Sequence, residues 1–219
     1  MSNIVITGAN RGIGFGLAKE FSKSGHNVIG ICRNASNDMR NHCSEVLDGY
    51  DLTKEESLAS LYENLSGTKI DILINNAGIL QQDSLSQLPS NSLLDQFKVN
   101  AMAPILLTSK ILPLIQKPGK VVVITSRMGS IADNGSGGYY GYRMSKAAVN
   151  AAFVSLARDL ASSDIHVAII HPGMVATEMT GRQGIPVEEA VSGIVHRINE
   201  LNASSSGKFY HQNGEELPW

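Results

Sequence analysis

The chain has 219 residues, 42% of them hydrophobic, which is enough to fill one substantial core and predicts a single domain over residues 1–219. Its 18 basic residues nearly balance its 20 acidic ones, which excludes a basic footprint for nucleic acid or for an anionic membrane and indicates a small-molecule partner. No apolar run could span a bilayer, no signal peptide precedes the first strand-like run, and Cys32 and Cys43 are too few for a disulfide framework, so we expect a cytoplasmic protein with free thiols.

Short apolar runs alternate with helical stretches along the whole chain. Strands are expected at 3–7, 27–32, 45–50, 70–75, 120–126, 165–170 and 208–210, and helices at about 13–24, 54–65, 92–115, 140–161 and 187–201. Strands that are apolar almost throughout, each followed by a helix, indicate a parallel sheet covered on both faces. The sequence therefore predicts an α/β protein with a doubly wound, Rossmann-type sheet of about seven strands.

A glycine-rich loop follows the first expected strand and opens the first helix. It reads Thr7-Gly8-Ala9-Asn10-Arg11-Gly12-Ile13-Gly14, with the spacing Gly-x-x-x-Gly-x-Gly. Such a loop can bring backbone N–H groups and a helix N-terminus against a pyrophosphate, although a tight turn can also need glycines for steric reasons alone. At the first turn of an α/β sheet we predict phosphate binding by Gly8, Asn10, Arg11, Gly12, Ile13 and Gly14.

Tyr142 and Lys146 stand four residues apart near the start of an expected helix and therefore share one face. A phenol titrates near pH ~10 in water, and a neighbouring ammonium favours the phenolate, so the pair can exchange protons closer to neutral pH. Tyr139 and Tyr140 have no lysine at this spacing. Taken alone, the pattern also fits a surface stacking pair.

These features occur in an order that resembles the short-chain dehydrogenase/reductase family. Nearly the whole chain is covered, because Asp51, Asn75-Asn76-Ala77-Gly78, Asn100, Ser126 and the run from Pro172 to Thr177 also match. The stretches 124–130 and 214–219 are most similar to the branch that holds the C-factor (C-signal) proteins and the sniffer-type carbonyl reductases.

The resemblance implies a catalytic set of four residues. Tyr142 would be the general acid in carbonyl reduction and the base in alcohol oxidation, and Lys146 would lower its pKa while binding the nicotinamide ribose. Ser126 would hold the substrate oxygen where charge develops. Asn100 would bend its helix and hold a water in a proton relay to Lys146, although a plain helix residue ahead of Pro104 is the alternative.

The position of the catalytic serine has a rival. Ser126 precedes Tyr142 by sixteen residues, a few more than is usual in the family, with residues 133–138 as the expected site of the extra length. Ser130 is therefore an alternative. A serine at the carboxyl end of a strand fits the position of ligand crevices in α/β sheets, which favours Ser126.

The resemblance also implies the contacts of a dinucleotide. Asn76, Ala77 and Gly78 would line its ribose, and Asp51 would receive the adenine amino group with Leu52 packed beside it. In the run after the sixth expected strand, the cofactor contacts would be Pro172, Gly173, Val175 and Thr177, with the nicotinamide carboxamide on the Val175 backbone and the Thr177 hydroxyl. The alternative for this run is a simple Pro-Gly turn.

The end of the second expected strand indicates which nicotinamide cofactor is used. NAD-specific relatives place an acidic residue there, and this chain has Cys32 followed by Arg33. Arg11 supplies a second guanidinium, and two arginines converging on a 2′-phosphate favour NADP(H) over NAD(H). Either arginine alone also fits a solvated surface charge.

The combined prediction is an NADP(H)-dependent oxidoreductase without a metal site, acting on a ketone, an aldehyde or the corresponding alcohol. A homodimer through the helices at about 92–115 and 140–161 is expected, with a tetramer as the alternative. One rival is a cofactor-binding signalling or sensor protein of the C-factor type with incidental catalysis. A second rival, a nucleotide-sugar epimerase or dehydratase, would need a C-terminal substrate domain for which this chain has no residues.

Overall fold

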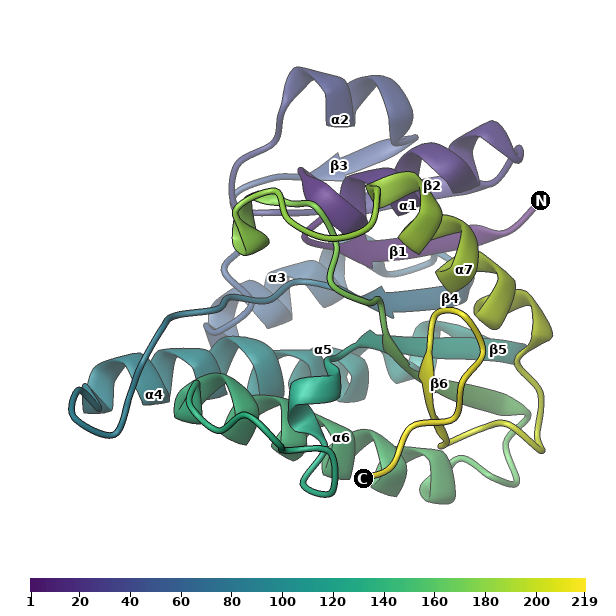
Figure 1. Cartoon of the computed structure of the whole chain (residues 1–219). Coiled ribbons are helices and arrows are strands. Elements are labelled where there is room, and N and C mark those ends of the chain that lie inside the picture. The colour runs from purple at the N-terminus through teal and green to yellow at the C-terminus, as the bar shows by residue number, and fades with distance from the viewer.

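Seven strands build the sheet of the computed structural model, which describes residues 1–219 (Figure 1). They are β1 (Asn3–Thr7), β2 (Asn27–Ile31), β3 (Glu45–Leu47), β4 (Ile70–Asn75), β5 (Ile115–Ile124), β6 (Ile165–His171) and β7 (Phe209–His211). All neighbours are parallel, in the order β3-β2-β1-β4-β5-β6-β7. Because the order reverses between β1 and β4, a crevice is expected where their carboxyl ends diverge. The predicted fold class is confirmed.

Two layers of helices cover the sheet. They are α1 (Gly12–Lys23), α2 (Asn37–His42), α3 (Glu55–Leu65), α4 (Ser90–Phe97), α5 (Ala103–Ile111), α6 (Tyr140–Asp159) and α7 (Val187–Glu200). One apolar core lies between the sheet and α3, α5 and α6, and the other lies between the sheet and α1, α2 and α7 (Figure 1). The strands are buried on both faces, which explains why they read as continuous apolar runs.

The expected long helix over 92–115 is wrong as a single element. The chain forms α4, a π-helical turn η1 (Lys98–Met102), α5 and a short 3₁₀ turn η2 (Leu112–Leu114), after which Ile115 already begins β5. Pro113 lies in η2, and since proline has no N–H to continue the helical ladder, the helix ends there. The π-helical turn is centred on Asn100, whose contacts are described below.

The polar stretch between the second and third strands also differs from expectation, because it contains α2. Ser36 precedes this helix, and its Oγ accepts a hydrogen bond of 3.1 Å from the N–H of Met39. Met39 is fully buried and packs over Gly30 of β2. The helix is short and mostly exposed, so it carries no apolar periodicity from which it could have been predicted.

None of the helices is both long enough and apolar enough to cross a lipid bilayer.

Candidate active site

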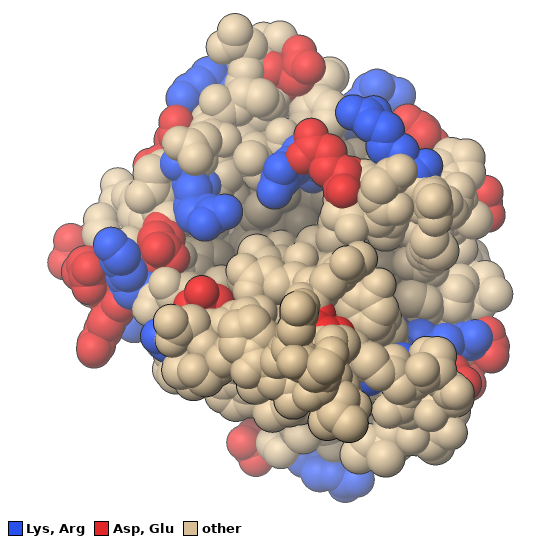
Figure 2. All heavy atoms as spheres, turned by 60° about the vertical axis from the view of Figure 1, so that its left-hand side comes forward, with Lys and Arg blue, Asp and Glu red and all other residues tan.

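The predicted site residues lie along the carboxyl edge of the sheet. The glycine loop follows β1, Arg33 follows β2, Asn76 follows β4, Ser126 follows β5 and Pro172 follows β6. Because parallel strands end at the same edge, these segments become neighbours although they are far apart in sequence. Figure 2 brings this edge toward the viewer and shows a hollow near its centre, with charged side chains along its upper rim and mostly uncharged ones below.

The glycine loop packs against the end of β4 so closely that two of its positions exclude a side chain. Gly8 has a φ of +66°, and a Cβ there would lie 3.0 Å from the Cα of Ala77. A Cβ on Gly14 would lie 2.3 Å from the carbonyl oxygen of Gly8. The loop therefore presents bare backbone at the start of α1, which is the kind of cradle a pyrophosphate fits. Ile13 anchors it by packing against the core under α1.

Hydrogen bonds tie this loop to the segment after β4. The backbone N–H groups of Asn76 and Ala77 both donate to Thr7 Oγ1 at 3.0 Å. Asn76 Nδ2 donates to the carbonyl oxygens of Thr7 at 3.0 Å and Gly8 at 3.3 Å. The Asn76 side chain thus fixes the shape of the loop. The ribose contact predicted for Asn76 would then come from its amide oxygen or the neighbouring backbone.

Tyr142, Lys146 and Ser126 are buried together beside the carboxyl end of β5. Tyr142 and Ser126 are each 8% exposed and Lys146 is 5% exposed. Lys146 Nζ lies 5.7 Å from the centroid of the Tyr142 ring and donates a hydrogen bond of 3.0 Å to the carbonyl oxygen of Ile124, the last residue of β5. The Ser126 side chain lies close enough to the Tyr142 hydroxyl to act on its pKa. The structure therefore brings the three predicted side chains into one cluster.

Burial changes the ionisation of both titratable groups in this cluster. It raises the pKa of Tyr142 to about 12, and the nearby Ser126 side chain offsets only part of that rise. It lowers the pKa of Lys146 to about 8. The direction for Tyr142 is opposite to the sequence expectation, which considered only the neighbouring ammonium and not the removal of the phenolate from water. At neutral pH Tyr142 is therefore a neutral proton donor.

Asn100 lies in η1 and is 1% exposed. Its Oδ1 accepts from the Ile79 N–H at 2.8 Å, and its Nδ2 donates to the Ile79 carbonyl at 2.8 Å and to Ser145 Oγ at 3.0 Å. A Cβ on Gly78 would lie 3.2 Å from Asn100 Oδ1 and 3.8 Å from Lys146 Nζ, so Gly78 leaves room for both polar groups. Asn100 is thus placed near Lys146 at an irregular turn, whereas the water relay stays a prediction.

Ser126 and its rival Ser130 differ in what their hydroxyls meet. Ser130 is 3% exposed, and its Oγ accepts a hydrogen bond of 3.0 Å from the N–H of Asp133 in its own turn. Ser126 Oγ likewise accepts a hydrogen bond of 3.1 Å from the N–H of Met128 in its own turn, but the Ser126 side chain also lies close enough to the Tyr142 hydroxyl to act on its pKa. These contacts favour Ser126. Residues 133–138, the expected site of the extra length, form a mostly exposed loop.

Asp51, Leu52 and Arg33 lie at the end of the crevice beyond the glycine loop. Asp51 Oδ1 accepts from the Thr53 N–H at 3.1 Å and from Thr53 Oγ1 at 2.8 Å. Burial acts to raise the pKa of Asp51, but these hydrogen bonds and the charges of Lys54 and Arg33 outweigh it, so the pKa is lowered. Leu52 packs against the core beside them. Arg33 is exposed and close enough to Asp51 to influence its charge.

Arg11 and Asn10 extend from the glycine loop toward different neighbours. Arg11 forms an ion pair with Glu178, at the start of the 3₁₀ turn η4 (Glu178–Thr180), and the two side chains are 67% and 63% exposed. Asn10 Nδ2 donates to the carbonyl oxygen of Asn34 at 3.2 Å, which ties the loop to the segment after β2. Arg11 and Arg33 lie beside different carboxylates, and their convergence on a 2′-phosphate stays a prediction.

The segment from Pro172 to Thr177 closes over the glycine loop from the side of β6. Pro172 and Val175 are buried, and the Val175 carbonyl accepts a hydrogen bond of 2.6 Å from Thr180 Oγ1. Gly173 has a φ of +86°. A Cβ on Gly12 would lie 3.3 Å from Thr177 Cγ2. Thr177 therefore lies against the glycine loop, whereas the nicotinamide contacts of this segment stay a prediction.

Asp83 is a residue of this site that the sequence analysis missed. Its two carboxylate oxygens accept the first N–H groups of α6, from Tyr140 and, at 2.8 Å, from Gly141. Tyr139 at the N-cap position is left-handed and offers no side-chain cap, so Asp83 supplies the cap from 57 residues away. Nothing in the sequence marks it, because capping residues are sought next to a helix and not in a distant loop.

Comparisons with known proteins agree with this geometry. The family model described as short chain dehydrogenase matches residues 2–186. The 1-hydroxy-2-glutathionyl-2-methyl-3-butene dehydrogenase of Rhodococcus sp. (strain AD45) is 34% identical over 100% of both chains. The C-signal protein of Myxococcus xanthus is 38% identical over 71% of this chain and 96% of its own.

Two solved structures share the fold over the whole chain. The carbonyl reductase Sniffer of D. melanogaster has a TM-score of 0.89 and 30% identity, with 100% of both chains covered. The NADPH-bound carbonyl reductase from chicken fatty liver also has a TM-score of 0.89, with 26% identity and coverage of 100% of this chain and 99% of that one. The resemblance to the branch of C-signal proteins and sniffer-type reductases is thereby confirmed.

Proposed function

This chain belongs to the short-chain dehydrogenase/reductase family, and from that premise we propose that it is an NADP(H)-dependent oxidoreductase that reduces a ketone or aldehyde or oxidises the corresponding alcohol. The observation that carries the proposal is the burial of Tyr142, Lys146 and Ser126 together beside Gly78, at the same edge of the sheet as the closely packed bare backbone of the glycine loop.

The residues present fit a nicotinamide dinucleotide. The bare backbone at Gly8 and Gly14 would admit a pyrophosphate, and Asp51 with the nearby Arg33 would bind the adenosine end. When bound, the dinucleotide supplies or accepts the hydride, which no side chain of the protein can do. The choice of NADP(H) rests on Arg33 and on the NADPH carried by a solved neighbour of the same fold.

The proton is handled by this chain's own residues. In reduction, Ser126 would hold the carbonyl oxygen of the substrate while Tyr142, neutral below pH 12, donates its proton to that oxygen. The charge of Lys146, buried a short distance behind the ring, would stabilise the phenolate that remains. In alcohol oxidation the phenolate would act as the base. Asn100 would hold the η1 turn and Ile79 against this cluster.

The proposal is tested by turnover of a panel of ketones and aldehydes with NADPH, followed by the loss of NADPH absorbance. Reduction of at least one member at a rate that requires the enzyme is expected.

The second candidate is a nucleotide-dependent signalling protein, and the 38% identity to a C-signal protein favours it. Tight NADPH binding without turnover of any carbonyl compound would favour that candidate over the enzyme.

Arg33→Asp is expected to weaken NADPH binding by about 100-fold and to leave NADH binding within about threefold, because the reversed charge repels only the 2′-phosphate. Dissociation constants from titration of each nucleotide check this. Arg158→Asp is the matched control, since Arg158 lies in the last turn of α6, at the opposite edge of the sheet. Equal losses for both nucleotides would contradict the assignment of Arg33 to the phosphate.

We also propose that the protein is a homodimer through α4, α5 and α6. Leu94 and Phe97 lie three residues apart on α4, Met102 and Leu106 lie four apart from η1 into α5, and all four are 39% to 53% exposed, which is typical of an interaction surface. Light scattering is expected to give twice the chain mass of 23.4 kDa. A mass four times that of the chain would indicate the tetramer, and the mass of one chain would refute both.

A further inference from the structure

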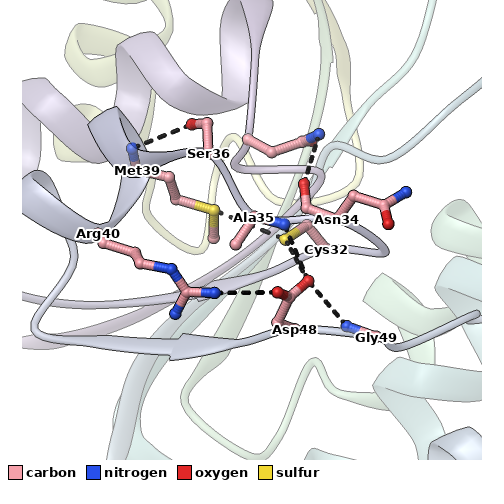
Figure 3. Close-up of polar contacts among 9 residues, drawn as sticks. Cys32, Asn34, Ala35, Ser36, Met39, Arg40, Asp48 and Gly49 are labelled. Carbon is pink, nitrogen blue, oxygen red and sulfur yellow. Dashed lines mark hydrogen bonds and ion pairs between the residues drawn. The ribbon is translucent and has the colours of Figure 1, made fainter.

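An acidic group lies closer to the end of β2 than the sequence of that strand indicates. Sequence reasoning found Cys32 and Arg33 there, where NAD-specific relatives carry a carboxylate. In the structure, a carboxylate reaches this point from the neighbouring strand, because Asp48 directly follows β3. Cys32 Sγ lies 3.8 Å from Asp48 Oδ1 (Figure 3).

Asp48 is held there by several partners at once. Its Oδ1 accepts the N–H of Ala35 at 2.8 Å and the N–H of Gly49 at 2.9 Å, and its Oδ2 accepts from the guanidinium of Arg40 at 3.0 Å (Figure 3). The Asp48 and Arg40 side chains are 37% and 52% exposed. The carboxylate therefore lies at the surface between the ends of β2 and β3, in a fixed orientation.

The charge of Asp48 is felt at the end of β2. Burial, and after it the charge of Asp48 and its hydrogen bond, raise the pKa of the Cys32 thiol to about 11, whereas Arg40 acts in the opposite direction. Ala35, which is bonded to Asp48, comes two residues after Arg33. Arg33, which would attract a 2′-phosphate, and Asp48, which would repel one, therefore lie near each other.

We propose that Asp48 is a cofactor-specificity residue, whose carboxylate reduces the preference for a 2′-phosphate and whose charge Arg40 partly neutralises. The inference rests on the proposed nicotinamide function and refines it. A phosphate at this point is attracted by Arg33 and Arg40 and repelled by Asp48, whereas ribose hydroxyls can donate to Asp48 Oδ2, which accepts from Arg40 alone. The site is then only moderately selective for NADP(H).

Asp48→Asn tests this with little change of shape. An asparagine keeps a side-chain oxygen that can accept from Ala35 and Gly49, but it removes the negative charge and releases Arg40. The ratio of the NADH to the NADPH dissociation constant, measured by titration of the full-length protein, is expected to rise about tenfold. Arg40→Gln is expected to lower the same ratio, because it removes the neutralising charge and leaves Asp48.

Asp159→Asn is the matched control, because Asp159 is the exposed last residue of α6 and lies at the opposite edge of the sheet. An unchanged ratio in Asp48→Asn that melts like the wild type would overturn the inference. If Asp48→Asn does not fold, Arg40→Gln decides, and an unchanged ratio there has the same meaning. Wild-type protein that binds neither nucleotide would refute the proposed function itself, whereas binding of both with unmoved ratios refutes only the role of Asp48.

Discussion

Tyr142→Phe is expected to lower kcat for carbonyl reduction by roughly 10²–10⁴-fold while leaving the dissociation constant of NADPH within about twofold. The phenol is the proton donor of the proposed reaction, and it is buried beside Ser126 and Lys146, so solvent does not readily replace it. Phenylalanine keeps the ring and its packing on α6 and removes only the hydroxyl. Steady-state rates with the best carbonyl substrate, together with a binding titration, measure both quantities.

The matched control is Tyr140→Phe, which deletes the same hydroxyl two residues earlier on α6. Tyr140 is 37% exposed, so its variant should keep the wild-type rate. If Tyr142→Phe retained full activity while Tyr140→Phe lost it, the proton donor would have been assigned to the wrong residue. If neither change altered the rate, proton transfer from this helix would be refuted.

The rate of carbonyl reduction is expected to fall as the pH rises through about 8, and Lys146→Met is expected to abolish this pH dependence and to lower kcat at pH 7 by about 100-fold or more. Burial lowers the pKa of Lys146 to about 8, so its stabilising charge is present below that pH and lost above it. Tyr142 stays protonated up to about 12, so ionisation of the phenol does not account for a decline near pH 8. The pH profile of kcat from 6 to 10 measures this.

Lys120→Met is the control for removing a partly buried lysine. Lys120 lies in β5, burial also lowers its pKa, and its Nζ donates to the carbonyl oxygens of Ile198 and Asn199 at the end of α7, far from Tyr142. The Lys120 variant should keep the decline near pH 8. A wild-type profile that is flat from pH 7 to 10 would contradict the role given to the Lys146 charge.

Features set by neighbours in the chain were predictable from sequence. The strands were found because burial on both faces requires apolar residues at every position, and β4 was placed at 70–75, as the structure has it. The glycine loop was found because only glycines permit backbone to approach a phosphate, and Tyr142 and Lys146 were found because four residues make about one helical turn. Each of these patterns carries its physical reason within a few residues.

Contacts between distant segments were decided only by the tertiary structure. Burial under the rest of the fold, which no local pattern reports, reverses the expected pKa shift of Tyr142. Asp83 caps the helix of Tyr142 from another loop, and Asp48 brings a carboxylate to the end of β2 from the adjacent strand. Sequence by itself therefore determined the sheet, the phosphate loop and the reacting pair, because these depend on local geometry. Folding decided the charges around them, because electrostatic effects depend on distance in space and on exclusion of water.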